Sequence, residues 1–154
     1  MSSVFKVVDA KPWHCGVMAR LLRDDYQKML LGAGAPAHAQ LRAVYDRSCL
    51  ARSWMIDGRL AGLGGLVGTL ASSDAYIWLA LSQEAMTFPH HVVAEARRQL
   101  AEFLTTKQEL WTTVTPSDPA ALRFAKFIGF FINGAPGQVG GITVFPMKIT
   151  AGEI

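Results

Sequence analysis

In PSDPAALRFAKFIGF, residues 116–130, a small acidic turn precedes a helical pattern, and a Gly-Phe pair follows it. Aspartate directly before proline is typical of a helix start, because its carboxylate accepts a hydrogen bond from a free backbone N–H and proline suits the first turn. We therefore expect a helix over 119–128, capped by Asp118. Residues 130–133 then predict a short strand, so the stretch returns the chain from helix to sheet.

The chain before this stretch alternates between the two periods of regular structure. ARSWMIDGRLAGLGGLVGTL, residues 51–70, predicts two strands joined by Asp57-Gly58, a strong hairpin signal. AYIWLAL, residues 75–81, predicts a dense strand buried on both faces. Apolar residues then recur at helical spacing from Val92 to Leu104, and ELWTTV, residues 109–114, predicts a further strand.

The two ends of the chain complete the pattern. A strand is expected over 5–8 and another over 142–149, and two helices follow the first strand. Their apolar positions are Val17, Met18, Leu21, Leu22, Tyr26 and Leu30 in one helix, and Leu41, Val44, Tyr45 and Cys49 in the other. The order β-α-α-β-β-β-α-β-α-β-β predicts a single domain over residues 1–154. Its class is α/β (α+β), with a mixed, mostly antiparallel central sheet flanked by helices.

Composition excludes several classes of protein. Hydrophobic residues make up 51% of the 154 residues and charged residues 18%, which excludes a disordered segment. The formal net charge is +3, and the basic residues are scattered, so we expect no nucleic-acid partner. No run approaches the ~20 apolar residues of a membrane span, and the N-terminus lacks the apolar core of a signal peptide. Both cysteines are expected to be free thiols, as in a cytoplasmic protein.

The element order, the Asp-Gly hairpin before a central strand and the helix-to-Gly-Phe ending together resemble the GNAT superfamily of N-acetyltransferases, over essentially the whole chain. In that superfamily acetyl-CoA lies between two diverging parallel strands, which implies a site after Leu81 and Val114 here. A closer resemblance is to a small GNAT-like family of short-tailed phages, described as internal virion or acetyltransferase proteins. It rests on YIWLAL and on ELWTTVTPSDPAALRFAKFIGF.

The resemblance implies a set of cofactor-binding residues. Main-chain groups of the strand segment Leu79, Ala80 and Leu81 would align the thioester of acetyl-CoA. The pyrophosphate would lie at the start of the next helix, near Thr87, His90 and His91, because a helix N-terminus attracts anions. Asp118 stands where the superfamily usually has an asparagine.

In EAMTFPHHVV, residues 84–93, the chain departs from the superfamily's glycine-containing phosphate motif. The glycines of that motif would align near Phe88 and His90. We expect the Phe88 side chain to block close approach of a phosphate, and Pro89 has no N–H to donate.

A second departure is Ala125, which stands where the superfamily usually has a tyrosine that protonates the departing thiolate. Ser117 or water would then be the proton donor. Glu84 or His91, just beyond the central strand, would be the base for the acceptor amine. The competing interpretation of Glu84 is an exposed loop residue, and that of Asp118 is a helix cap only.

Two functions remain open from these features. The first is an acyl-CoA-dependent N-acetyltransferase with a degenerate cofactor loop, which uses acetyl-CoA and a small-molecule or protein amine in the host cytoplasm. The second is a catalytically silent GNAT-fold protein that binds a phage virion or a host protein. Because the chain departs from the superfamily both in the cofactor loop and at Ala125, neither function is excluded.

Other patterns favour packing over chemistry. Strand positions predict core packing for the tryptophans Trp54, Trp78 and Trp111. The charged residues Arg20, Arg23, Asp24 and Asp25 predict a solvated face. Adjacent histidines on a helix point ~100° apart, and no third ligand has suitable spacing, so His90-His91 predicts no metal site. GLGG, residues 62–65, lies in a strand pattern and indicates bulges or close packing.

Overall fold

The computed structural model describes residues 3–24, 27, 36–139 and 141–152, so the predicted helix positions Tyr26 and Leu30 lie outside the described residues. The strands are β1 (Phe5–Asp9), β2 (Ser48–Ile56), β3 (Arg59–Val67), β4 (Asp74–Leu81), β5 (Glu109–Val114), β6 (Phe131–Ile132), β7 (Gly137–Val139) and β8 (Ile142–Thr150). The helices are α1 (His14–Leu21), α3 (Ala37–Arg47), α4 (Pro89–Phe103) and α5 (Pro119–Phe127), with a 3-10 turn η1 (Glu84–Thr87). The predicted element order is confirmed, with η1 and β7 added in segments expected as loops.

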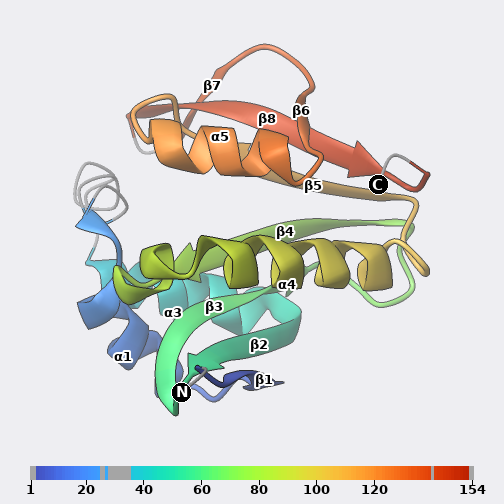
Figure 1. Ribbon diagram of the computed structural model, residues 1–154. Coiled ribbons are helices and arrows are strands. Elements are labelled where there is room, and N and C mark those ends of the chain that lie inside the picture. The colour runs from blue at the N-terminus through green and yellow to red at the C-terminus, as the bar shows by residue number, and fades with distance from the viewer. Residues whose placement is uncertain (1–2, 25–26, 28–35, 140, 153–154) are drawn as a thin grey trace.

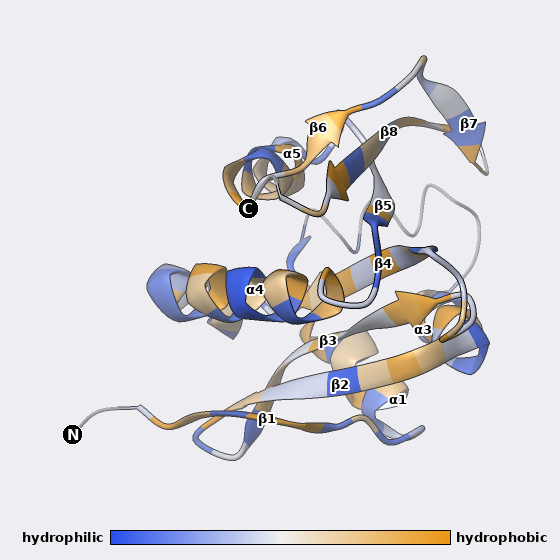
Figure 2. Ribbon diagram, turned by 90° about the vertical axis from the view of Figure 1, so that its right-hand side faces the viewer, coloured by the Kyte–Doolittle hydropathy of each residue, from blue (hydrophilic) through white to orange (hydrophobic). Residues whose placement is uncertain are grey.

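The strands form one mixed sheet in the order β1-β2-β3-β4-β5-β8-β6, with β7 paired to β8 (Figure 1). Every neighbouring pair is antiparallel except β4–β5, which is parallel. Figure 2 shows that β1–β4 form one group with α1 and α3, whereas β5–β8 form a second group with α5. The two groups meet at β4 and β5.

The β2–β3 hairpin confirms the turn that Asp57-Gly58 predicts. Both residues have positive φ, 50° and 79°, as the favoured two-residue hairpin turn requires. The expected helical place of Cys49 is wrong, because α3 ends at Arg47 and the backbone of Ser48 is already extended and pairs with Val67.

The sheet carries a separate apolar core on each face. Trp54, Leu81 and Leu110 belong to the core under α4 and α5, and Met18 and Trp78 belong to the core under α1 and α3. Core packing is thus confirmed for Trp54 and Trp78.

The same expectation is wrong for Trp111, which is 40% exposed. Its neighbour Leu110 packs with Ala125 of α5, and consecutive strand residues point to opposite faces. Trp111 therefore points away from α5.

Two glycines let β3 lie close to both of its neighbours. A Cβ at Gly65 would lie 2.2 Å from the carbonyl oxygen of Leu50, and one at Gly64 would lie 2.6 Å from that of Trp78. Both contacts are with backbone, which cannot turn aside as a side chain can. Close packing, as GLGG indicates, is confirmed.

We expect Gly65→Ala to lower the free energy of unfolding by about 2 kcal/mol, because the methyl group forces β2 and β3 apart. Urea denaturation followed by circular dichroism measures the change. Gly137→Ala is the matched control, since a Cβ there meets no atom within 4 Å. Equal stability of the two variants would show that the β2–β3 spacing is not under this constraint.

A buried ion pair connects the two groups of strands. Arg23 Nη2 donates to Asp118 Oδ2 at 2.7 Å, and Nη1 donates to Oδ1 at 3.3 Å. The side chains are 10% and 1% exposed, so the predicted solvated face is wrong for Arg23. Asp118 also accepts from Ala121 N–H at 3.2 Å, which confirms the helix cap. Arg23 N–H donates to the carbonyl oxygen of Leu81, so the pair connects the end of β4 to the start of α5.

Asp118→Asn should lower the free energy of unfolding by about 3 kcal/mol, because asparagine keeps the helix cap but removes the carboxylate charge that faces the buried Arg23 guanidinium. Asp46→Asn breaks the exposed Arg42–Asp46 pair and should cause no measurable change. Urea denaturation of both variants makes the comparison. A loss at Asp118 no larger than that at Asp46 would contradict a structural role for the buried pair.

Candidate functional site

The two parallel strands at the centre of the sheet diverge soon after they meet. Their paired residues are Asp74 with Glu109, Ala75 with Leu110, and Tyr76 with Trp111. On its other edge, β4 stays paired with β3 as far as Leu81. Residues 77–80 therefore have a strand partner on the β3 side and none on the β5 side.

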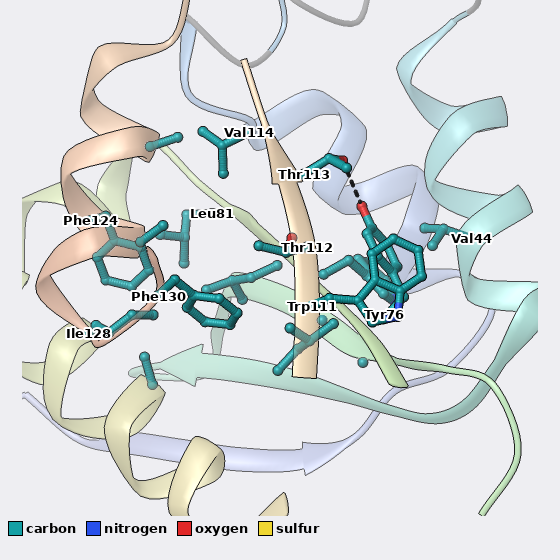
Figure 3. Close-up of a pocket in the computed structure, with 18 of the residues that line it drawn as sticks. Val44, Tyr76, Leu81, Trp111, Thr112, Thr113, Val114, Phe124, Ile128 and Phe130 are labelled. Carbon is teal, nitrogen blue, oxygen red and sulfur yellow. Dashed lines mark hydrogen bonds between the residues drawn. The ribbon is translucent and has the colours of Figure 1, made fainter. Parts of the chain in front are cut away.

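A cavity of about 870 Å³ opens where the strands diverge (Figure 3). This volume lies within the range of small-molecule and cofactor sites. Residues of α3, α4, α5 and both strands line it, so the cavity reaches both faces of the sheet.

The part of the cavity between α4 and α5 is apolar. Its lining residues include Leu79, Leu81, Val93, Val114, Phe124 and Ala125. Figure 3 shows Leu81, Val114 and Phe124 on one side of β5. Ala125, at the place where a tyrosine is usual, adds one more small apolar wall there.

The part beside α3 is aromatic and more polar. Tyr76, Trp111 and Thr113 line it, and α3 contributes Val44 and Arg47. The Tyr76 and Trp111 rings meet edge to face with centroids 4.7 Å apart. The Tyr76 hydroxyl lies 3.4 Å from Thr113 Oγ1, the contact dashed in Figure 3.

Arg23 and Asp118 also line the cavity, near the ends of the diverging strands. Asp118 brings a carboxylate charge to the cavity lining. Arg23 compensates that charge, and no local sequence signal links two residues so far apart in the chain.

The structure brings three of the predicted cofactor-binding residues to the cavity, namely Leu79, Leu81 and Asp118. Ala80 is fully buried on the opposite face of β4, in the core under α1 and α3. The described cavity lining does not include the other predicted residues, Thr87, His90, His91, Ser117 and Glu84.

Glu84 is held by an arginine at the surface. Arg59 donates to both carboxylate oxygens, with its shortest contact at 2.7 Å. This hydrogen bonding lowers the pKa of Glu84, which makes its carboxylate a weaker base. A role for Glu84 in catalysis stays a prediction.

The other predicted residues surround the start of α4 or of α5. His91 stacks on Phe5, with ring centroids 5.9 Å apart, and Thr87 Oγ1 donates to the Glu84 carbonyl oxygen. The Ser117 hydroxyl lies 2.8 Å from Thr115 Oγ1. Their predicted roles also stay predictions.

Phe88 was expected to obstruct the cofactor, and its ring meets His91 edge to face at 6.0 Å. It is not among the described residues that line the cavity, whereas Pro89 is. The first α-helical hydrogen bond of α4 runs from Val92 N–H to the Phe88 carbonyl oxygen. The N–H groups of His90 and His91 precede it, so neither has an acceptor within the helix.

Sequence reasoning missed Tyr76 and Thr113 as cavity residues. Strand alternation places Tyr76 and Trp78 on one face, but only the end of β4–β5 pairing shows that Tyr76 borders a cavity. Within the described part of the chain, no group of three or more histidine, cysteine, aspartate or glutamate side chains is placed to hold a metal ion. None of the described helices is long and apolar enough to cross a membrane.

No protein-family model matches the chain, and no curated protein matches it in sequence. Solved structures do match its fold. Aminoglycoside acetyltransferase AAC(6')-Ib, solved with ribostamycin and coenzyme A, aligns with a TM-score of 0.71 at 14% identity, over 95% of this chain and 93% of that one.

Two further solved structures also match the fold of this chain. Spermidine N-acetyltransferase from Vibrio cholerae, solved with CoA and spermine, aligns with a TM-score of 0.67 at 15% identity, over 97% and 96% of the two chains. An acetyltransferase of the GNAT family from Streptococcus pneumoniae aligns with a TM-score of 0.60 at 14% identity, over 97% and 100%. The chain therefore has the fold of the GNAT acetyltransferases.

Proposed function

We propose that this chain, as one domain over residues 1–154, is an acyl-CoA-dependent N-acetyltransferase that acts on a small-molecule amine. The observation that carries the proposal is the edge of β4 over residues 77–80, which has no strand partner on the side of the cavity. Solved neighbours of the same fold hold coenzyme A together with ribostamycin or spermine, which supports the proposal.

The cavity suits the arm of coenzyme A that carries the thioester. That arm contains amide groups, and the open edge of β4 offers backbone N–H and C=O groups to pair with them. Main-chain groups of Leu79, Ala80 and Leu81 would align the thioester there. Phe124 and Val114 supply apolar walls that keep water away from the reacting atoms.

The N-terminus of α4 would hold the diphosphate. The N–H groups of His90 and His91 have no acceptor within the helix, and the positive end of the helix dipole favours an anion. Pro89 occupies the first helical position and donates nothing, so fewer N–H groups are available than at a glycine-containing loop.

When bound, acetyl-CoA would supply an acetyl group activated as a thioester. The amine would enter on the α3 side, because the opposite side is the apolar channel between α4 and α5. Tyr76 and Trp111 line this entrance and can contact the organic part of the amine.

We expect calorimetry to show micromolar binding of acetyl-CoA, and Ala121→Phe to weaken it at least about tenfold, a loss of about 1.4 kcal/mol. Ala121 is a half-buried residue of α5 that lines the cavity, so a larger side chain there occupies space that the ligand needs. Ala101→Phe, on the exposed surface of α4 outside the lining, is the control and should bind like the unmodified protein.

Absence of binding to the unmodified protein at millimolar acetyl-CoA would reject the proposed function. The remaining function would then be that of a silent GNAT-fold binding protein, including the predicted phage or host association. Equal binding by the two phenylalanine variants would place acetyl-CoA elsewhere on the protein.

We expect Glu84→Gln to change the rate of acetyl transfer less than about threefold, because a carboxylate with a lowered pKa, bound to Arg59 outside the cavity, is a poor base. Steady-state kinetics with a panel of primary amines measures this. A fall of about a hundredfold, with unchanged affinity for acetyl-CoA, would instead establish Glu84 as the base.

A further inference from the structure

We propose that the Tyr76 hydroxyl protonates the sulfur that leaves during acetyl transfer, and that Thr113 returns a proton to Tyr76. This inference rests on the proposed function. It assigns an acid to a cavity in which Ala125 brings no hydroxyl group.

The Tyr76 and Thr113 hydroxyl groups lie where β4 and β5 diverge. Tyr76 and Trp111 are the last paired residues of β4 and β5, so Tyr76 lies where the cavity narrows to the joined strands. Thr113 lies two residues further along β5 and also lines the cavity. The oxygen–oxygen distance of 3.4 Å spans the divergence between the strands (Figure 3).

Few acidic groups occur among the described residues of the cavity lining. Among the described residues that line the cavity there is no histidine, cysteine, lysine or glutamate, and Tyr76 is the only phenol. Both carboxylate oxygens of Asp118 accept hydrogen bonds from Arg23, so this side chain is already engaged as an acceptor. Asp74 is at the paired start of β4, before the strands diverge. Tyr76 is thus the best-placed proton donor at the point of divergence.

Packing contacts orient the Tyr76 ring. The Tyr76 ring packs edge to face on Trp111 and against the core under α1 and α3. These contacts leave the hydroxyl group directed at Thr113 and the cavity, as Figure 3 shows. A donor that is already oriented loses little conformational freedom when it acts.

The amine nitrogen forms a bond to the carbonyl carbon, and the carbon–sulfur bond breaks with its electron pair on sulfur. Sulfur takes the proton of Tyr76 Oη, and the phenolate takes a proton from Thr113 Oγ1, which regains one from water. The nitrogen releases its surplus proton to solvent on the α3 side. The products are one amide and one thiol, and the protein returns to its starting state.

Calorimetry can detect the hydroxyl–sulfur contact without turnover. The unmodified protein should bind CoA about fivefold more tightly than desulfo-CoA, because only CoA has a sulfur for Tyr76 to meet. In Tyr76→Phe this ratio should fall to about one, since the ring remains and the hydroxyl is lost. Tyr45→Phe is the matched control, because its hydroxyl makes a similar 3.5 Å contact, to Ala10, outside the cavity lining.

Kinetics then tests the proton transfer. Tyr76→Phe should lower kcat about a hundredfold and weaken acetyl-CoA binding by no more than about fivefold, the contribution of the hydroxyl–sulfur contact, and Thr113→Val should lower kcat about tenfold. Replacement of the tyrosines by 3-fluorotyrosine makes each phenol more acidic. The alkaline fall in kcat should then begin at lower pH, and this shift should be missing in Tyr76→Phe.

The outcomes separate the two proposals. Binding of acetyl-CoA by the unmodified protein, with the same CoA to desulfo-CoA ratio in Tyr76→Phe, would overturn the role of Tyr76 and leave the proposed function intact. A Tyr76→Phe variant with a kcat within about threefold of the unmodified protein would do the same. Failure of the unmodified protein to bind either ligand would reject both proposals.

Discussion

Three residue pairs join β4 to β5, and the rest of the molecule depends on this short parallel contact. If the pairing continued to the ends of both strands, hydrogen bonds would satisfy the edge of β4 and no cavity would exist. If it were missing, the sheet would separate into two units. The short contact therefore leaves polar backbone beside apolar side chains, a combination that suits a ligand with both amide groups and an apolar chain.

The Arg23–Asp118 pair lies at the other end of the cavity, near the carboxyl ends of β4 and β5. It joins the end of β4, through the backbone N–H of Arg23, to the first turn of α5. Desolvating two charges is costly, and an apolar contact could hold the segments at lower cost. The pair instead fixes the relative orientation of the two segments and balances the charge of the carboxylate in this part of the cavity. The pair thus holds two segments of the chain together and also balances the charge of the Asp118 carboxylate.

Local signals in the sequence predicted much of the fold. Asp57-Gly58 specified a hairpin turn, and Asp118-Pro119 specified a helix start, since both depend on neighbouring residues only. Contacts between distant segments could not be predicted in this way. The charged residues around Arg23 have the composition of a solvated face, and only the folded chain brings Asp118 to Arg23.

In the candidate site, too, local sequence patterns placed some residues and could not place others. Leu79 and Leu81 could be placed at a cavity because they belong to the central strand. The exposure of Trp111 could not be predicted from the sequence. Strand periodicity shows which residues share a face of the sheet, but it does not show which face a helix covers. The role expected for Glu84 depended on sequence position alone, which gave no sign of its pairing with Arg59.

The pairing of β5 also affects the order in which the molecule can fold. β5 pairs over its whole length with β8, from Glu109 with Thr150 to Val114 with Phe145, but with β4 through its first residues only. Strand β8 follows every other described strand in the chain. The wall of the cavity made by β5 and α5 therefore depends on contacts of long sequence separation, which form slowly, while the hairpin of β2 and β3 needs only near neighbours. In a nascent chain the first four strands are also synthesised before β5, α5 and β8, so the cavity acquires its second side last.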